Sequence, residues 1–454
     1  MTVQKMSPEV RVDALHARIE SLLDQGEIRK AQIILQALLP VDQAEIFSEL
    51  ERDEQRSLLQ GLPLETVADI LEKVEDEEVA EIANWLPTTQ LAPILDEMEP
   101  DEAADLLGDM RAEEAIHVLN EMDSFEAISP LLLHPDETAG GLMTSEYLAL
   151  GQQMWTDRAL EAIRQWDTER EYLTYFVVDK EGRLTGSVSL LKILRAPAKE
   201  KLVDIMDRNV VTASVDADQE RCAQLMSRYD LTALPVVDAA AQLAGVITID
   251  DIVDVLEEEA TEDIQRLGGS APLEKSYLRT SAWEIAQRRL GWLLLLFVTG
   301  LITTNVLAFF EDTLSQMVAL SFFIPLLIGT GGNAGSQTTS TIIRALSLGE
   351  VERKDAMHVL WHEIQVGLLL GALVGIAGFL RAWVFEGNMP LGITIGLAIA
   401  VIVFWSSSVG SLLPIFASMI GADPALISGP LMSTLVDATG LFIYLTVAQW
   451  VLGL

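Results

Sequence analysis

A single carboxylate, Asp437, stands inside the apolar run GPLMSTLVDATGLFIYL near the C-terminus. Residues 385–454 contain no Lys or Arg, so no base in this region can neutralise it. An Asp at the centre of a membrane-spanning helix costs ~2.5–3.5 kcal/mol on insertion scales, and such residues usually face a partner group or a watery path. Asp437 is therefore expected either to be a protonated acid bonded to a nearby hydroxyl or to face water and bind a cation.

Polar side chains crowd a second apolar run, PLLIGTGGNAGSQTTS, at residues 325–340. Close packing of helices needs small residues but not amides, so Asn333 and Gln337 favour the lining of a pore over packing, which stays the alternative. The glycines lack the Gly-Lys-Ser/Thr of a phosphate-binding loop, and we exclude that interpretation. By contrast, Gly367, Gly371 and Gly375 recur every four residues and predict close helix packing.

The residues around this acid favour a hydrated cation. Mg²⁺ dehydrates reluctantly and is held by one or two carboxylates while it keeps several waters. No Cys or His follows residue 387 to favour a softer metal. Five helices could scarcely enclose a hydrated ion, so we expect a two-fold dimer with two copies of Asp437 across one axis.

A run of acids, TIDDIVDVLEEEATEDI, lies at residues 248–264, and residues 229–265 contain no Lys or Arg. Acids four residues apart, such as Asp254, Glu258 and Glu262, repel one another along a helix face. The ordinary explanation of such a run is a solvated surface. The other is that divalent ions bridge acidic surfaces that would otherwise separate, which would make the segment a cation sensor.

Two unlike parts of the chain must position these residues. Residues 1–270 hold 57 Asp and Glu against 22 Lys and Arg, whereas residues 271–454 hold 11 against 8. Because a bilayer core takes ~20 helical residues, the apolar part fits five spans. We predict them at 289–311, 314–344, 362–386, 390–420 and 425–453.

The orientation follows from the flanking charges. Arg288 and Arg289 precede the first predicted span, and the opening residues have no apolar core of signal-peptide length. The first 280 or so residues are therefore expected in the cytoplasm and the C-terminus outside. A single cysteine, Cys222, excludes an internal disulfide and fits a reducing compartment.

The acidic part contains two kinds of repeat. Residues 12–130 repeat short amphipathic helices, such as PLETVADILEKV, in the pattern of a stacked helical superhelix. The segments that begin at Tyr175 and Leu234 align at an offset of 59, and each predicts a β-hairpin followed by a helix. This duplication resembles a tandem pair of CBS domains.

The predicted fold is multidomain. It consists of an all-α superhelical domain at 1–135, α/β tandem CBS domains at 136–265, a long connecting helix at 266–288 and a transmembrane domain of five helices at 289–454.

This order of parts, together with the motifs PLLIGTGGNAGSQTTSTIIRALSLGEV and ADPALISGPLMSTLVD, resembles the MgtE family of magnesium channels. The resemblance implies a homodimer in the lipid bilayer, with an ion path on the two-fold axis and cytoplasmic domains that close it when they bind Mg²⁺. It implies that Asp437 holds hydrated Mg²⁺ and that the carbonyl of Ala422 lies beside it. Asp423, Asn333 and Gly329 are implied near the path.

The resemblance also implies acids that bind regulatory Mg²⁺. Those near the second CBS domain are Asp218, Glu220, Asp230, Asp251, Asp254, Glu259, Glu262 and Asp263. Those in the helical domain are Asp101 and Asp105. CBS pairs of the family bind adenine nucleotides, so ATP is a further expected ligand, with no residue assigned to it.

Two other functions stay open. Asp437 could take up a proton in a secondary transporter of divalent cations, or it could pair with Asp423 in an intramembrane aspartyl protease, although the Gly-x-Gly-Asp motif is absent. A membrane-anchored nucleotide sensor without transport is disfavoured by the polar residues of the second span. We expect a Mg²⁺ uptake protein of the cell membrane that is not an enzyme and binds no nucleic acid.

Overall fold

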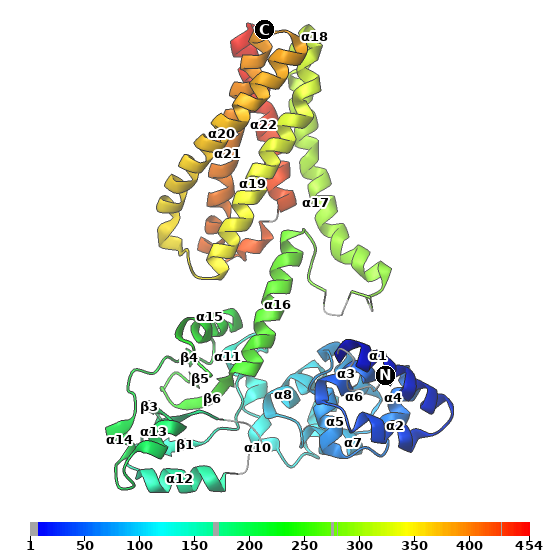
Figure 1. Ribbon diagram of the computed structural model, residues 1–454, viewed down its shortest axis with the longest axis vertical. Helices are drawn as coiled ribbons and strands as arrows, with labels where there is room; N and C mark the ends of the chain where they lie inside the picture. The colour runs from blue at the N-terminus through cyan, green and yellow to red at the C-terminus, as the bar shows by residue number, and fades with distance from the viewer. Residues whose placement is uncertain (1–7, 167–171, 274–276, 279, 428) are drawn as a thin grey trace. The chain divides into compact units, whose positions relative to one another are not determined.

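The computed structural model describes residues 8–166, 172–273, 277–278, 280–427 and 429–454. The chain divides between Leu256 and Glu257 into two compact units, coloured blue to green and green to red in Figure 1.

The first unit begins with short helices that repeat along the chain. From α3 to α9 a new helix begins every 12 residues, and alternate helices pack together, as α3 does with α5 and α5 with α7. Proline starts several of them, because its fixed φ suits the first turn and its missing N–H is not needed there. The helices are α1 Pro8–Asp24, α2 Ile28–Leu35, α3 Pro40–Glu49, α4 Arg52–Leu59, α5 Leu64–Leu71, α6 Asp76–Trp85, α7 Thr88–Leu95, α8 Pro100–Asp109, α9 Ala112–Leu119, α10 Phe125–Ile128, η2 Leu131–Leu133 and α11 Ala139–Leu142.

Two three-stranded sheets follow and have the same topology. In each, the first strand is parallel to the second and the second is antiparallel to the third. Val177 pairs with Gly186 in one sheet and Val236 with Gly245 in the other, at the predicted offset of 59. The strands are β1 Ala149–Gly151, β2 Thr174–Val178, β3 Leu184–Ser189, β4 Ala213–Ser214, β5 Ala233–Val237 and β6 Leu243–Thr248. The helices around them are α12 Thr156–Gln165, α13 Leu190–Arg195, α14 Leu202–Ile205, α15 Gln219–Tyr229 and α16 Ile249–Leu267.

The duplicated glycines have a packing reason. A Cβ on Gly186 would lie 2.6 Å from Met206 Sδ, and one on Gly245 would lie 2.5 Å from Met143 Cγ. Each methionine therefore packs directly on the strand backbone of a hairpin. The predicted helical superhelix and CBS pair are both confirmed.

The link to the apolar part differs from the helix expected at 266–288. The long helix is α16, which ends at Leu267, and α17 begins only at Ala282. Gly269 has φ +74, a conformation that favours glycine, and Pro272 follows shortly after, so helix cannot continue through this stretch. The first half of α16 belongs to the first unit and the second half to the second unit.

The second unit is a helical bundle. In the described residues, five helical segments are long and apolar enough to cross a membrane, as predicted. Its elements are α17 Ala282–Phe309, α18 Glu311–Gln316, η3 Val318–Phe323, α19 Ile324–Ser347, η4 Arg353–Asp355, α20 Ala356–Glu386, α21 Met389–Met419, η5 Pro424–Leu426 and α22 Gly429–Leu452. Figure 1 shows α19, α20, α21 and α22 gathered together, with α17 along one side.

The close packing predicted for the third span is confirmed. Gly371 and Gly375 are buried against α21, where a Cβ on either would lie 2.7 or 2.6 Å from a backbone carbonyl oxygen of Ala400 or Gly396. Small residues here let the two backbones approach.

Candidate ion path and acidic clusters

The helices α19 and α22 run antiparallel and meet through small and hydroxyl residues. Ser336 Oγ donates to the Gly429 carbonyl at 3.1 Å and lies 3.2 Å from Ser433 Oγ. At the other end of the pair, the Tyr444 hydroxyl donates to the Leu320 carbonyl at 2.9 Å. Ser336, one polar residue of the second span, therefore lies against the helix that carries Asp437.

Asp437 lies on α22 one turn beyond Ser433. A Cβ on Gly332 would lie 3.3 Å from Ser433 Oγ, and in an antiparallel pair four residues onward on α22 correspond to four residues back on α19. Asp437 is thus near the level of Ile328 and Gly329, and a Cβ on Gly329 would meet no atom within 4 Å.

Asp437 itself is half-buried. Among the described residues it has no hydrogen bond or ion pair with the protein. Because α22 begins at Gly429, later than the predicted 425, Asp437 lies ~12 Å from the helix start, nearer that end than expected. A carboxylate that the chain leaves without a partner is available to a ligand.

One face of α19 is open in the single chain. Gly329, Asn333, Gln337 and Thr341 are all exposed and recur every four residues, whereas Gly331, Gly335 and Thr339 are buried. Asn333 and Gly329, two of the predicted path residues, therefore share one face of α19. Gly329 lies near the level of Asp437, and Asn333 lies one turn further along α19.

The loop between α21 and α22 holds Ala422 and Asp423. Asp423 Oδ1 accepts a hydrogen bond from Ala425 N at 2.7 Å and caps η5. Its other oxygen pairs with Arg266, which also pairs with Glu262. On the next turn back, Asp263 Oδ2 accepts from Ser347 Oγ at 3.0 Å, and burial raises the pKa of Asp263. The second half of α16 thus contacts the ends of α19 and of this loop through predicted acids.

Arg266 was missed because it lies two residues beyond the acidic run. The i to i+4 spacing from Glu262 is the sequence signal that could have identified the pair. Its contact with Asp423 joins residues far apart in the chain and had no local signal.

The first unit holds a second group of acids. One carboxylate oxygen from each of Glu99, Asp101 and Asp251 lies within 4.8 Å of the other two. Asp251 Oδ2 also accepts from Thr248 Oγ1 at 2.6 Å. Burial, and after it the negative charge of Asp251, raise the pKa of Asp101 well above its usual range. This set brings together two predicted acids and adds Glu99, the residue before α8.

This geometry fits a divalent cation. Mg²⁺ takes oxygen ligands, one or two of them carboxylates and the others waters. A cation among the three acids would relieve the repulsion that now disfavours the ionised form of Asp101. Asp105, one helical turn from Asp101, is not in the set.

The remaining predicted acids are placed separately. Asp218 caps α15 by accepting from Glu220 N at 3.0 Å, Glu220 Oε1 accepts from Gln224 Nε2 at 3.3 Å, and Asp230 ends the helix at φ 50. Asp254 is exposed on α16 in the first unit, and Glu259 belongs to the second. The group of three acids found among the described residues includes none of them.

Thermal unfolding of the full chain should report the cluster of Glu99, Asp101 and Asp251. Mg²⁺ should raise the unfolding temperature, because a ligand at 100 times its dissociation constant stabilises the folded state by ~2.7 kcal/mol. Asp101→Asn should remove most of that increase. Glu113→Gln, at an exposed position on α9, should leave it unchanged. An unchanged Mg²⁺ response in Asp101→Asn would contradict this assignment.

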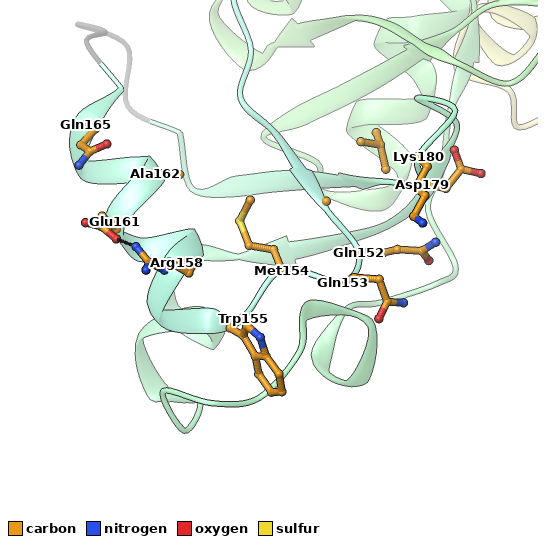
Figure 2. Close-up of a pocket in the computed structure, with 12 residues that line it drawn as sticks. Gln152, Gln153, Met154, Trp155, Arg158, Glu161, Ala162, Gln165, Asp179 and Lys180 are labelled. Atoms are coloured by element: carbon orange, nitrogen blue, oxygen red, sulfur yellow. Dashed lines mark hydrogen bonds and ion pairs between the residues drawn. The ribbon is translucent and has the colours of Figure 1, made fainter.

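A cleft of about 670 Å³ lies on the first sheet, between the loop after β1, the start of α12 and the end of β2 (Figure 2). Trp155 is 44% exposed there, with Lys201 Nζ 5.5 Å over its ring. Arg158 Nη1 pairs with Glu161 Oε2 at 2.6 Å, and the exposed Lys180 also lines the cleft. The cleft offers an aromatic face and cationic groups outside both acidic clusters.

Family models match three parts of the chain. Residues 38–135 match the MgtE intracellular N domain, residues 202–258 a CBS domain, and residues 324–447 the MgtE divalent cation transporter domain.

Whole proteins and a solved structure agree with these matches. The chain is 40% identical to the magnesium transporter MgtE of Thermus thermophilus over 326 residues, 72% of each chain. It is 31% identical to that of Bacillus subtilis over 446 residues, 98% of each. The first part is similar, at 32% identity and a TM-score of 0.50, to a crystal structure of the cytosolic domain of the Mg²⁺ channel MgtE in complex with ATP, covering 53% of this chain and 99% of that one.

The similarity to a full-length relative extends through the soluble part and all five spans, so the chain is a multi-pass membrane protein with a soluble N-terminal part. The chain belongs to the MgtE family of divalent cation transporters.

Proposed function

We propose that the chain forms a Mg²⁺-selective channel for Mg²⁺ uptake, with Asp437 of two copies on the ion path, and that cytosolic Mg²⁺ closes it. The observation that carries the proposal is the carboxylate of Asp437, which lies inside a membrane span without a partner among the described residues. One carboxylate per copy, amide neighbours and room for water suit an ion that keeps its hydration shell. The relatives' identification as magnesium transporters supports Mg²⁺ as the ion.

A homodimer is part of the proposal. The open face of α19 carries Asn333 and Gln337, and amides exposed to lipid are costly. No residue of α17 is buried within the chain, so this span also has surface for a neighbour. A two-fold axis beside α19 would cover both surfaces and bring the two copies of Asp437 to one path.

A proton-coupled transporter is the competing mechanism, since an intramembrane Asp can carry a proton. Purified full-length protein in a planar bilayer separates the two. A channel should pass Mg²⁺ current with equal pH on both sides, and reversing a pH gradient should not shift the reversal potential. Flux that requires a proton gradient would overturn the channel.

A protease reaction has less support. An aspartyl dyad needs two facing carboxyl groups that share a proton. Asp423 is instead paired with Arg266 and caps η5, whereas Asp437 lies within α22.

The roles of Ala422 and Asp423 are proposed at the inner end of the path, where the loop between α21 and α22 meets α16.

Regulation by cytosolic Mg²⁺ is proposed to act through the acids on and around α16. The cluster of Glu99, Asp101 and Asp251 supports it, because three carboxylates that repel one another are held together best by a divalent ion. Glu262, Asp263 and Asp423 form a second acidic group around Arg266. The other predicted acids are proposed to bind regulatory Mg²⁺ outside these two groups. They are Asp105, Asp218, Glu220, Asp230, Asp254 and Glu259.

ATP is proposed as a further ligand of the CBS domains, because the similar solved structure is a complex with ATP. Calorimetric titration of the full chain with ATP should give saturable heat. Trp155→Ala tests the cleft of Figure 2 as the place of binding, with Trp85→Ala on α6 as the control. No heat on titration of the native chain would contradict nucleotide binding.

A further inference from the structure

Four successive residues of α19, at 336–339, point in four different directions around the helix. Consecutive residues of an α-helix are turned by about 100°. Ser336 bonds to Gly429 and Ser433 of α22, Thr338 to Glu363 of α20 and Thr339 to Gly410 of α21. Gln337 has the remaining direction and is exposed. Each of the three neighbouring helices is therefore bonded to one hydroxyl of the same turn.

The contact with α20 differs from the other two because its acceptor is a carboxylate. Thr338 Oγ1 donates to Glu363 Oε2 at 3.3 Å, and the Glu363 side chain is only 13% exposed. Hydrogen bonds to charged acceptors are stronger than those between neutral groups. One turn further along both helices, Ile342 and Val359 pack together with Ile415 in a small apolar cluster. The polar pair and this cluster together hold α19 against α20.

The helices α19 and α21 approach each other closely at Gly410. A Cβ on Gly410 would lie 2.8 Å from the Gly335 carbonyl oxygen and 3.4 Å from Thr338 Cβ. A turn of α19 by one residue would exchange the exposed amide of Asn333 for the methyl group of Ala334, which packs against the apolar core. The polarity of the open face therefore depends on the rotation of α19.

We propose that Thr338 and Glu363 are positioning residues that set the rotation of α19 and so hold Asn333 and Gln337 on the ion path. This inference rests on the proposed function, in which the open face of α19 lines the path. Neither residue needs to touch the ion, because each acts through the helix that it fixes.

The test uses two reporter cysteines in the full-length protein in liposomes. Asn333→Cys lies on the open face and Ala334→Cys on the packed face. The measured quantity is the ratio of their modification rates by a water-soluble, membrane-impermeant thiosulfonate. The native Cys222 is fully buried, and burial raises the pKa of its thiol to about 11, so it should not react.

The open-face cysteine should react faster than its neighbour in the otherwise native chain. Thr338→Val and Glu363→Leu should each reduce the ratio at least about tenfold, because a hydrogen bond to a charged group contributes ~1.5 kcal/mol or more. Thr338→Ser keeps the hydroxyl and Glu363→Gln keeps an acceptor, so both should preserve the ratio.

The outcomes separate this inference from the proposed function. An unchanged ratio in both Thr338→Val and Glu363→Leu would overturn the role of the pair alone. A reduced ratio in Thr338→Ser and Glu363→Gln would also overturn it, because the hydrogen bond would not be the cause. Equal rates for Asn333→Cys and Ala334→Cys in the otherwise native chain would overturn the open face and the proposed path with it.

Discussion

Replacing Asp437 by Ala should reduce Mg²⁺ current through the purified protein by at least about a hundredfold, because an uncompensated charge inside a membrane span costs ~2.5–3.5 kcal/mol on insertion scales. The side chain is half-buried within α22 and has no partner in the described part of the chain, so no neighbour can substitute for it. In a dimer both copies of the ligand are lost together. The measurement is current per reconstituted protein with Mg²⁺ as the only permeant cation.

Two control variants make this result specific. Asp437→Glu keeps a carboxylate and should retain measurable current. Asp312→Ala removes an acid from α18, outside the predicted path, and should conduct like the native chain. Full current in Asp437→Ala, with the protein eluting as the native oligomer, would remove this residue from the mechanism.

Neutralising three acids of α16 together, as Asp251→Asn, Glu259→Gln and Glu262→Gln, should raise the Mg²⁺ concentration for half-inhibition at least about tenfold, since oxygen-ligand sites tune affinity over decades by the charge they present. Asp251 belongs to the cluster with Glu99 and Asp101, and Glu262 to the group around Arg266. The triple variant thus weakens both acidic groups at once. Current is recorded while Mg²⁺ is raised on the side of the soluble domains.

The matched control removes the same charge from exposed helices of the N-terminal repeats. Glu45→Gln, Asp53→Asn and Glu113→Gln change the net charge equally and should leave inhibition as in the native chain. If both triple variants respond to Mg²⁺ as the native chain does, the acidic run is only a solvated surface.

The fold could largely be predicted because its signals are local. Amphipathic repeats, the duplicated hairpins and five long apolar segments each depend on residues close in sequence. The connecting helix predicted at 266–288 was wrong, because α16 ends at Leu267, just before Gly269 and Pro272. The sequence has helical patterns on both sides of this break, and they do not show which of the two helices is the longer.

The candidate sites were less accessible from the sequence. Asp437 could be singled out because one acid in an apolar run is conspicuous at once. Glu99 could not, since one acid among many gains meaning only when folding places it near Asp101 and Asp251. Likewise, the sequence gives no signal that Thr338 and Glu363 interact, because their contact forms only when α19 and α20 pack together. Contacts between distant segments are decided by packing, which a single sequence does not encode locally.

Unitary currents from purified full-length protein in a bilayer, recorded at equal pH on both sides, test whether the protein is a Mg²⁺ channel that cytosolic Mg²⁺ closes. Mg²⁺ is titrated on the side that the soluble domains face. We expect Mg²⁺-carried openings that disappear as this Mg²⁺ rises, that persist in the α16 triple variant and that are absent in Asp437→Ala. Mg²⁺ transport without unitary openings, or openings indifferent to Mg²⁺ on that side, would contradict this expectation.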